Sequence, residues 1–510
     1  MAGTGKSRDR GWRRESERMI VMKFGGTSVE DGKAIERVAE IVGARLEQKP
    51  VVVVSALARV TDALVTMSQL AASGALAEGL RLHRQVRQRH FAVLGSLLNG
   101  RGETEVRSRL QALLDSLEDV LRGVAALGEL SPRTSDNLLS FGELLSSQIV
   151  STVFRARGMP AVLVDSRQMI VTDASYTRAV PQGEETNRRL RQSLKPLLTS
   201  GQVPVMGGFI AATAEGVPTT LGRGGSDFSA ALVGAGLGAR KIQIWTDVEG
   251  MMTTDPRLCP DARRIDIIGF DEASELAHFG AKVLHPATLI PAVEKNIPVY
   301  ILNSRNPESK GTCIRAHARP SKTILRSIAA KRGVRVINVR LPRIVALPRI
   351  VAGPGFLHAL FEAFDRHACS ADLVSTSDVS VSLAVEASRD LTGLVQDLKR
   401  LGSVEVEDKK AILCLVGEKL RGRIGVAARV FSVLASASIN VHMISQGASE
   451  INISFVIEER DVPEAVKQLH AYFFAERAGD PRWLAKRANR GRALPGENNE
   501  GLAGATRAAW

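Results

Sequence analysis

The residue types best suited to chemistry lie together in one glycine-rich segment, residues 221–230 (LGRGGSDFSA). Glycines such as Gly224 and Gly225 let a backbone approach a ligand closely and present N–H groups to it. Small residues follow in helical order, and the positive end of a helix dipole favours an anion. Arg223 has the planar shape that matches a carboxylate or phosphate, and Asp227 could hold a metal ion or a lysine. The segment predicts a site where an anion is held while phosphate moves.

Two further segments supply lysines for such chemistry. Residues 20–28 (IVMKFGGTS) predict a strand that carries Lys23 and ends in a glycine turn, and residues 279–286 (FGAKVLHP) contain Lys282. A side-chain carboxylate, with a pKa of ~3.9, is already ionised at neutral pH, so if such a group were the phosphate acceptor it would need no general base. Such a reaction instead needs cations and N–H groups that neutralise two anions and hold them in line.

These segments must be positioned by alternating strands and helices. Residues 51–54 (VVVV) are typical of a buried parallel strand, and Ile35, Val38, Ala39 and Val42 lie on one face of a helix. A leucine-rich stripe at helical spacing around residues 110–124 predicts core packing. The alternation indicates an α/β sandwich across residues 19–315.

In this order, the three segments resemble those of aspartate kinases, within the amino acid kinase family, and the similarity runs from about residue 20 to about residue 474. The resemblance implies a carbamate-kinase-like α/β/α domain. It also implies transfer of the γ-phosphate of ATP, with Mg²⁺, to the side-chain carboxylate of L-aspartate. The product would be 4-phospho-L-aspartate, the first intermediate towards lysine, threonine and methionine.

The same resemblance implies a role for each site residue. Lys23 would neutralise the transferring phosphoryl group, Asp227 would orient Lys23, and Lys282 would complete the phosphate cage. Arg223 would hold the α-carboxylate of aspartate and Glu143 its ammonium group, with Thr61 and Ser226 beside them. Relatives often have tyrosine where this chain has Met252. The residues expected to bind ATP are Lys23, Phe24, Gly25, Gly26, Ser55, Gly224, Gly225, Thr246, Asp247, Met252, Arg257 and Lys282.

The C-terminal third contains an internal repeat, with an offset of about 70 residues between Gly355 and Gly425. Each copy predicts a helix, two alternating strands and a second amphipathic helix. Two such units resemble tandem ACT domains, which have a ferredoxin-like βαββαβ fold. The first would span residues 332–410, and the second would combine residues 324–331 with residues 411–475. A tandem duplication, LPRIVA at 341–346 and again at 347–352, lies within the first unit.

The ACT resemblance implies feedback inhibition by an amino acid bound between paired ACT domains of a homodimer, which could assemble further into a tetramer. Asp372 is the natural partner for the ammonium group of the inhibitor. Lysine is the expected inhibitor and threonine the alternative, because some lysine-sensitive relatives have glutamate where this chain has Asp378. The matching positions are Gly355, Phe356, Leu357, Ser370, Asp372, Thr376, Ser377, Asp378 and Val379.

Composition favours this interpretation over other classes. The net charge of +14 suggests nucleic acid, but aromatic residues make up only 4% of the chain and form no stacking pattern. Residues 1–18 and 476–510 are expected to be basic, disordered tails. The four cysteines lack metal or disulfide spacing, and no apolar run is long enough for a membrane, which predicts a cytoplasmic protein. Two alternatives stay open: a kinase for another amino acid such as glutamate, and a non-catalytic amino-acid-binding regulator.

Overall fold

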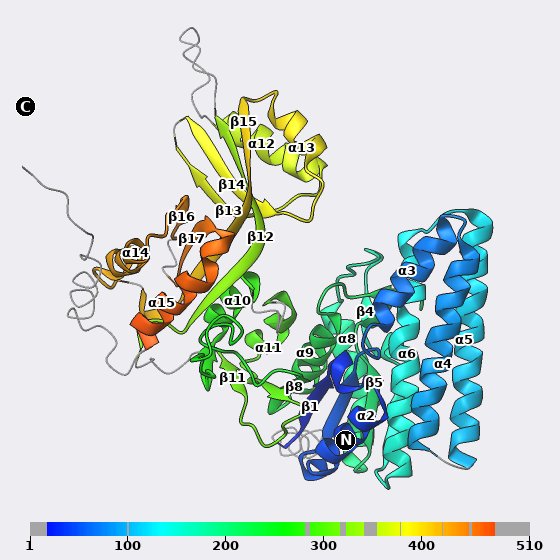
Figure 1. Ribbon diagram of the computed structural model, residues 1–510. Helices are drawn as coiled ribbons and strands as arrows, with labels where there is room; N and C mark the ends of the chain where they lie inside the picture. The colour runs from blue at the N-terminus through cyan, green and yellow to red at the C-terminus, as the bar shows by residue number, and fades with distance from the viewer. Residues whose placement is uncertain are drawn as a thin grey trace, which may run out of the picture.

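The structure is a computed structural model that describes residues 18–98, 101–280, 286–316, 323–340, 354–377, 379–420, 422–447 and 451–474. Lys282, Asp378, the duplicated segment and both tails therefore lie outside the described residues. Figure 1 shows an N-terminal α/β region that ends in a bundle of long helices and a C-terminal region built on a second sheet. Helix α10 (Phe270–His278) and strand β11 (Thr312–Arg315) lie between the two.

A twisted sheet forms the centre of the N-terminal region. Its order is β3-β5-β2-β1-β8-β10-β11-β9, and its pairs are parallel except for β10 with β11. The predicted valine strand is confirmed, because Val51–Val54 are all fully buried. Its strands are β1 (Ile20–Phe24), β2 (Pro50–Val54), β3 (Ala161–Val164), β5 (Val203–Gly207), β8 (Lys241–Thr246), β9 (Ile267–Gly269), β10 (Val299–Asn303) and β11.

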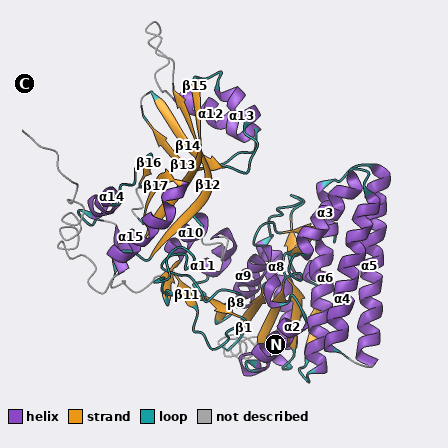
Figure 2. Cartoon of the chain, viewed as in Figure 1, coloured by secondary structure: helices purple, strands orange, loops and turns teal. Residues whose placement is uncertain are grey.

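Helices cover both faces of this sheet. One face packs against α2 (Gly32–Gly43), α3 (Val60–Ala72), α4 (Leu76–Leu97), α5 (Arg101–Leu127) and α6 (Pro132–Ala156), the long helices of Figure 2. The other face packs against α8 (Gly183–Thr199), α9 (Gly225–Leu237), α10 and α11 (Ile290–Glu294). The leucine stripe is confirmed as core packing, because Leu110, Leu114, Leu117 and Leu121 of α5 are fully buried. Smaller elements are α7 (Ser166–Met169) and a sheet of β4 (Val171–Thr172), β6 (Ile210–Thr213) and β7 (Pro218–Thr220).

The C-terminal region has one six-stranded sheet in the order β13-β14-β12-β15-β17-β16. The predicted repeat is confirmed, because each half has a helix, two strands and another helix. The strands are β12 (Ser327–Arg340), β13 (Ala371–Thr376), β14 (Ser380–Glu386), β15 (Ser403–Val416), β16 (Met443–Ser445) and β17 (Asn452–Glu458). The helices are α12 (Pro354–Arg366), α13 (Thr392–Leu398), α14 (Val426–Ser436) and α15 (Val462–Phe474).

Strand β12 joins the two halves. Its first part pairs with β15 alone, from Ser327 to Lys331, whereas the part from Val334 to Arg340 pairs with both β14 and β15. A register shift separates the two parts between Lys331 and Val334. This shift supports the division predicted after residue 331, although the domain limits themselves stay a prediction.

Two simpler expectations concern cysteines and membranes. Cys259, Cys313, Cys369 and Cys414 are all buried and free, as a packing role requires. Within the described ranges, no helix combines the length and apolar character needed to span a bilayer.

Candidate active site

Six parallel strands, β3, β5, β2, β1, β8 and β10, end at one edge of the central sheet, and several of the predicted site residues follow them. The turn after β1 is joined to its neighbours by backbone hydrogen bonds: the N–H of Gly25 donates to Trp245 O (3.0 Å), and the N–H of Ser55 to Phe24 O (3.0 Å). After β5, the N–H of Gly208 donates to Val54 O at 2.8 Å. Ligands of open α/β sheets bind at the carboxyl ends of strands, so this edge is the candidate active site.

Lys23 and Asp227 meet at this edge. Lys23 is on β1 and Asp227 is in the first turn of α9, and Lys23 Nζ lies 2.6 Å from Asp227 Oδ1. Only a tenth of each side chain is exposed. A buried pair of this kind holds its lysine in one position, from which the ammonium can reach an anion at the helix N-terminus.

The glycine turn before α9 has the backbone that its sequence predicts. Gly222 and Gly224 both have φ of +72°, in the left-handed region that only glycine adopts without strain. Gly224 is the N-cap of α9, and no side chain caps the helix there. Among the predicted aspartate-binding residues, Arg223 is exposed at this turn and Ser226 is half-buried in the first turn of the helix.

A second glycine turn, which the sequence reading missed, faces this one. Residues Gly207, Gly208 and Phe209 follow β5, and a Cβ on Gly208 would lie 2.6 Å from the Cβ of Ser226. The N–H of Phe209 donates to Ser229 Oγ at 2.9 Å, and Phe209 has φ of +65°. The paired glycines directly after the apolar residues 203–206 (VPVM) were the available signal, because glycines allow two loops to approach closely.

Glu143 of α6 is a buried carboxylate at the same edge. Its Oε1 accepts the N–H of Ala56 at 3.1 Å, whereas its Oε2 has no hydrogen-bond partner among the described residues. Burial raises the pKa of Glu143 to about 8, against the opposing effects of the Ala56 N–H and the positive charge of Lys23. An unpaired buried carboxylate oxygen is a natural acceptor for an ammonium group.

The other predicted residues lie around this centre. Ser55 follows β2, and Thr61 is half-buried in the first turn of α3. The loop between them is held by Arg89, which donates to Ala58 O (2.6 Å) and to Glu30 O (2.9 Å). Phe24 is fully buried and stacks on Trp245, so only its backbone is available to a ligand.

The predicted nucleoside loop follows β8. Thr246 ends the strand and Asp247 follows it. Ser304, which directly follows β10, joins this strand end to the turn after β1: the N–H of Ser304 donates to Thr246 O, and Ser304 Oγ lies 2.8 Å from Ser28 Oγ. Met252 is half-buried further along. Arg257 is exposed and pairs with Asp255 at 2.7 Å.

The predicted inhibitor-binding residues fall into two groups. Gly355, Phe356 and Leu357 begin α12 on the same side of the sheet as the β13–β14 turn. Thr376, Ser377 and Val379 form this turn and are exposed. Asp372 lies near the opposite end of β13, roughly 13 Å along the strand from Thr376, and Ser370 directly precedes that end.

Asp372 already has a cationic partner. Lys331 Nζ of β12 donates to both carboxylate oxygens of Asp372 at 2.7 and 2.6 Å, and His278 of α10 lies 3.9 Å away. The Asp372 side chain is only a tenth exposed. The residue expected to receive an inhibitor's ammonium group therefore holds the ammonium group of Lys331 here.

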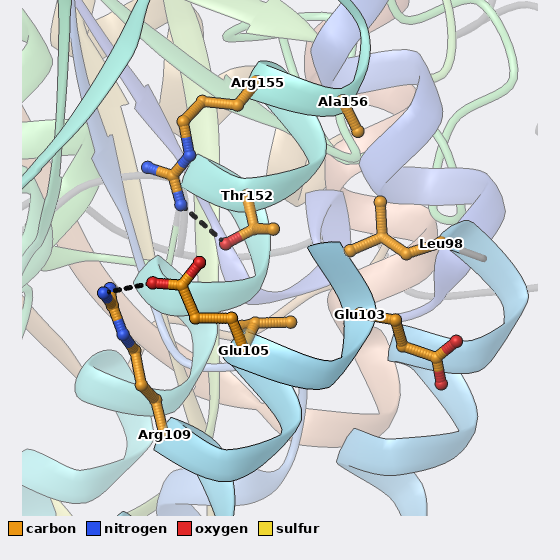
Figure 3. A pocket seen from close by; sticks show the side chains of 8 residues that line it. Leu98, Glu103, Glu105, Arg109, Thr152, Arg155 and Ala156 are labelled. Atoms are coloured by element: carbon orange, nitrogen blue, oxygen red, sulfur yellow. Dashed lines mark hydrogen bonds and ion pairs between the residues drawn. The ribbon is translucent and has the colours of Figure 1, made fainter. Parts of the chain in front are cut away.

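A separate hollow of about 380 Å³ lies between α5 and α6 (Figure 3). The two arginines that line it already have partners within the protein: Arg109 forms an ion pair with Glu105, and Arg155 donates a hydrogen bond to Thr152 Oγ1. Thr152 is roughly 14 Å along α6 from Glu143, so the hollow is separate from the candidate active site.

Comparison with known proteins agrees with this geometry. Residues 18–303 match the amino acid kinase family, and residues 413–473 match an ACT domain. Lysine-sensitive aspartokinase 3 of Escherichia coli is 37% identical over 464 residues, covering 89% of this chain and 99% of that protein.

Two crystal structures of E. coli aspartokinase III are also similar, each at 36% identity. One is in complex with aspartate and ADP; it has a TM-score of 0.76 and covers 89% of this chain and 99% of that one. The other is in complex with lysine and aspartate; it has a TM-score of 0.77 and covers 90% of this chain and 100% of that one.

Proposed function

The chain belongs to the aspartokinases of the amino acid kinase family, and we propose how its residues divide the work of phosphorylating L-aspartate with ATP. The observation that carries the proposal is the juxtaposition of the Lys23–Asp227 pair with the unpaired Oε2 of buried Glu143. The Lys23–Asp227 pair suits a phosphate, and the unpaired Oε2 of Glu143 suits the ammonium group of an amino acid.

Lys23 and the two facing glycine turns are proposed to hold the phosphates of ATP. The side chain of Lys23 would neutralise charge that builds up on the transferring phosphoryl group, and Asp227 would keep Lys23 in place. Among the described residues, no group of three or more His, Cys, Asp or Glu side chains could cage a metal ion. Mg²⁺ would therefore be held chiefly by the nucleotide phosphates near Asp227, where it would supply further positive charge. Lys282 would add a second lysine.

The amino acid would be held at both of its non-reacting groups. Glu143 is proposed to accept the ammonium group, and exposed Arg223 at the mouth of α9 to hold the α-carboxylate. Thr61 and Ser226 would contact the same ligand. The side-chain carboxylate would then face Lys23, in line with the phosphoryl group.

Lysine is proposed as the feedback inhibitor, because a similar E. coli enzyme has been crystallised with lysine and aspartate. The two groups of predicted residues lie at opposite ends of β13, so one pocket can use both only if a second subunit contributes. Strand β13 is the last strand at one edge of the regulatory sheet, and an edge strand can pair with another chain. These observations support a homodimer through the ACT region.

In this arrangement, the ammonium group of the inhibitor would compete with Lys331 for Asp372. Strand β12 carries Lys331 and also contacts the end of α10, because a Cβ on Gly280 would lie 2.8 Å from Ala330 O. Release of Lys331 could thus shift the backbone of Ala330, which lies against Gly280, two residues before Lys282. This gives the inhibitor a short physical route to the phosphate site.

An assay of the purified protein tests the proposal. L-aspartate and MgATP should give an acyl phosphate that is trapped as a hydroxamate, and lysine should inhibit its formation. Product with glutamate but not with aspartate would overturn the substrate and favour a different amino acid kinase. Lysine binding without any phosphorylation would instead indicate a non-catalytic regulator, and inhibition by threonine alone would overturn the choice of inhibitor.

A further inference from the structure

The loop after β8 is held by the regulatory region as well as by the catalytic one. The N–H of Ile328 donates to Thr253 O at 2.8 Å, and the hydroxyl of Ser327 donates to Met252 O at 2.8 Å. Ile328 and Ser327 open β12, the first strand of the regulatory sheet. The backbone of residues 252–253 is therefore fixed by the strand that begins the other half of the molecule.

A side-chain hydrogen bond adds a second attachment. Thr253 Oγ1 lies 2.8 Å from Nε2 of His470, which is on α15, 217 residues away in the chain. Both residues are buried, with 7% of Thr253 and 3% of His470 exposed. The ring of His470 is also stacked on Phe474, with centroids 4.7 Å apart, so its orientation is constrained.

The direction of this hydrogen bond follows from the neighbours of Thr253. Its hydroxyl oxygen accepts the N–H of Arg263 at 2.9 Å, which leaves the hydroxyl proton for another acceptor. Burial lowers the pKa of His470, so at neutral pH the ring is neutral and one of its nitrogens can accept that proton. The imidazole of His470 thus supplies the acceptor for the hydroxyl proton of this buried loop residue.

Thr253 lies within the segment from Thr246 to Arg257, which contains four of the residues expected to bind ATP and is taken here to hold its nucleoside. We propose that His470 is a positioning residue for nucleotide binding, which holds this loop from the last helix of the regulatory region through Thr253. The inference rests on the proposed function, because it takes the loop after β8 to be the nucleoside site. It goes further by making ATP affinity depend on α15.

The test is calorimetric titration of the full chain with ADP, together with steady-state kinetics. His470→Leu should weaken ADP binding about three- to tenfold, the value of one buried hydrogen bond, and should raise the KM for ATP similarly. The KM for aspartate should change by less than about twofold, because Glu143 and Arg223 lie outside the loop.

Two variants of Thr253 sharpen the test. Thr253→Val removes the hydrogen bond to His470 together with the Arg263 N–H contact, so it should weaken ADP binding at least as much as His470→Leu. The double variant should bind ADP no more weakly than Thr253→Val alone, because His470→Leu removes nothing further. Thr253→Ser keeps the hydroxyl and should retain most of the affinity. Additive losses in the double variant would overturn the proposal.

A folding control separates positioning from general damage. Val433→Ala removes buried apolar volume from α14 of the same unit, where Val433 is 1% exposed, and should lower the melting temperature while leaving ADP affinity unchanged. Equal ADP affinity in wild type, His470→Leu and Thr253→Val would overturn this inference alone. Absence of ADP binding to the wild type would overturn the proposed function and this inference with it.

Discussion

The two halves of the molecule each contain a lysine–aspartate ion pair, buried in the first and partly buried in the second, and the pairs differ in what surrounds them. Lys23 and Asp227 stand at the carboxyl ends of parallel strands, beside two glycine turns and a helix N-terminus. Lys331 and Asp372 lie between strands of the regulatory sheet, with His278 of α10 near them. Both pairs have an N–O distance of 2.6 Å.

The comparison shows that the pair itself does not determine its role. At the first site, open N–H groups and exposed Arg223 can receive anions next to the lysine, so Lys23 is suited to phosphate. At the second site, the neighbouring groups come from a strand and from the catalytic region, so Lys331 is suited to transmit a change. Removing Lys23 should therefore lower the rate of phosphoryl transfer, whereas removing Lys331 should change the sensitivity to the inhibitor.

The largest effect is expected from Lys23→Met. Without this charge at the transferring phosphoryl group, kcat should fall by about 10²–10³-fold or more, while the KM for aspartate changes little. The hydroxamate assay with saturating ATP measures both parameters. Lys331→Met is the matched control and should keep its uninhibited kcat within about twofold of the wild type. A comparable loss of kcat in both variants would contradict the assignment of different roles to the two lysines.

Arg223→Ala should have the next largest effect, on a different parameter. Loss of a charge-assisted contact to the α-carboxylate should raise the KM for aspartate by about 10–100-fold, because such contacts contribute about 1.5–3 kcal/mol. The effect on kcat should be smaller, since the carboxylate that Arg223 holds does not react. Arg257→Ala, at the exposed far end of the nucleoside loop, is the control, and its KM for aspartate should stay near the wild-type value.

The pH dependence of aspartate binding tests Glu143. Because the pKa of Glu143 is about 8 in the free protein, it is mostly protonated at pH 6 and must lose its proton to bind an ammonium group. Aspartate binding should therefore release a proton, and the KM for aspartate should fall about tenfold from pH 6 to pH 7 and level off above about pH 8.

Glu143→Gln provides the reference for this profile. It should bind aspartate weakly, and its KM should be independent of pH over the same range. Calorimetry of the wild type in buffers of different ionisation enthalpy should detect the released proton. A flat profile in the wild type would show that Glu143 does not receive the ammonium group.

The smallest effect is expected at the regulatory pair. If the inhibitor competes with Lys331 for Asp372, Lys331→Met should lower the lysine concentration for half-inhibition by about three- to tenfold. Asp372→Ala should instead relieve inhibition and leave uninhibited activity intact. Weaker inhibition in Lys331→Met would mean that Lys331 belongs to the inhibitor site and is not its competitor.

Much of the fold was predictable from periodicity. The valine strand follows from a continuous β-branched run, and the repeated helix–strand–strand–helix units follow from alternating and helical apolar spacing, all of which depend only on local sequence. The site was predictable where local chemistry is unusual, as in the turn around Gly224. Its residues converge because parallel strands end at one edge.

The contacts that were not predicted depend on which helices and strands pack together in the folded protein. Nothing near Thr253 indicates that His470, 217 residues later, will lie against it. Lys331 and Asp372 have no local pattern that predicts their pairing either, since it depends on how the distant strands β12 and β13 come together. The turn at Gly207 was missed because two adjacent glycines are common in sequences. They indicate a close approach only when the loop that packs against them is known.

Strand β12 has a consequence for the order in which the chain can fold. Its residues Ser327–Lys331 pair only with β15, whose matching residues Ile412–Val416 are about 80 positions later. During synthesis at roughly 5–20 residues per second, this piece of strand waits several seconds without a partner. The unit at residues 332–410 is complete before the other unit can close around it. A chain that has left the ribosome only as far as residue 410 should thus carry one complete ACT unit and one exposed strand, and at this stage a chaperone would matter most.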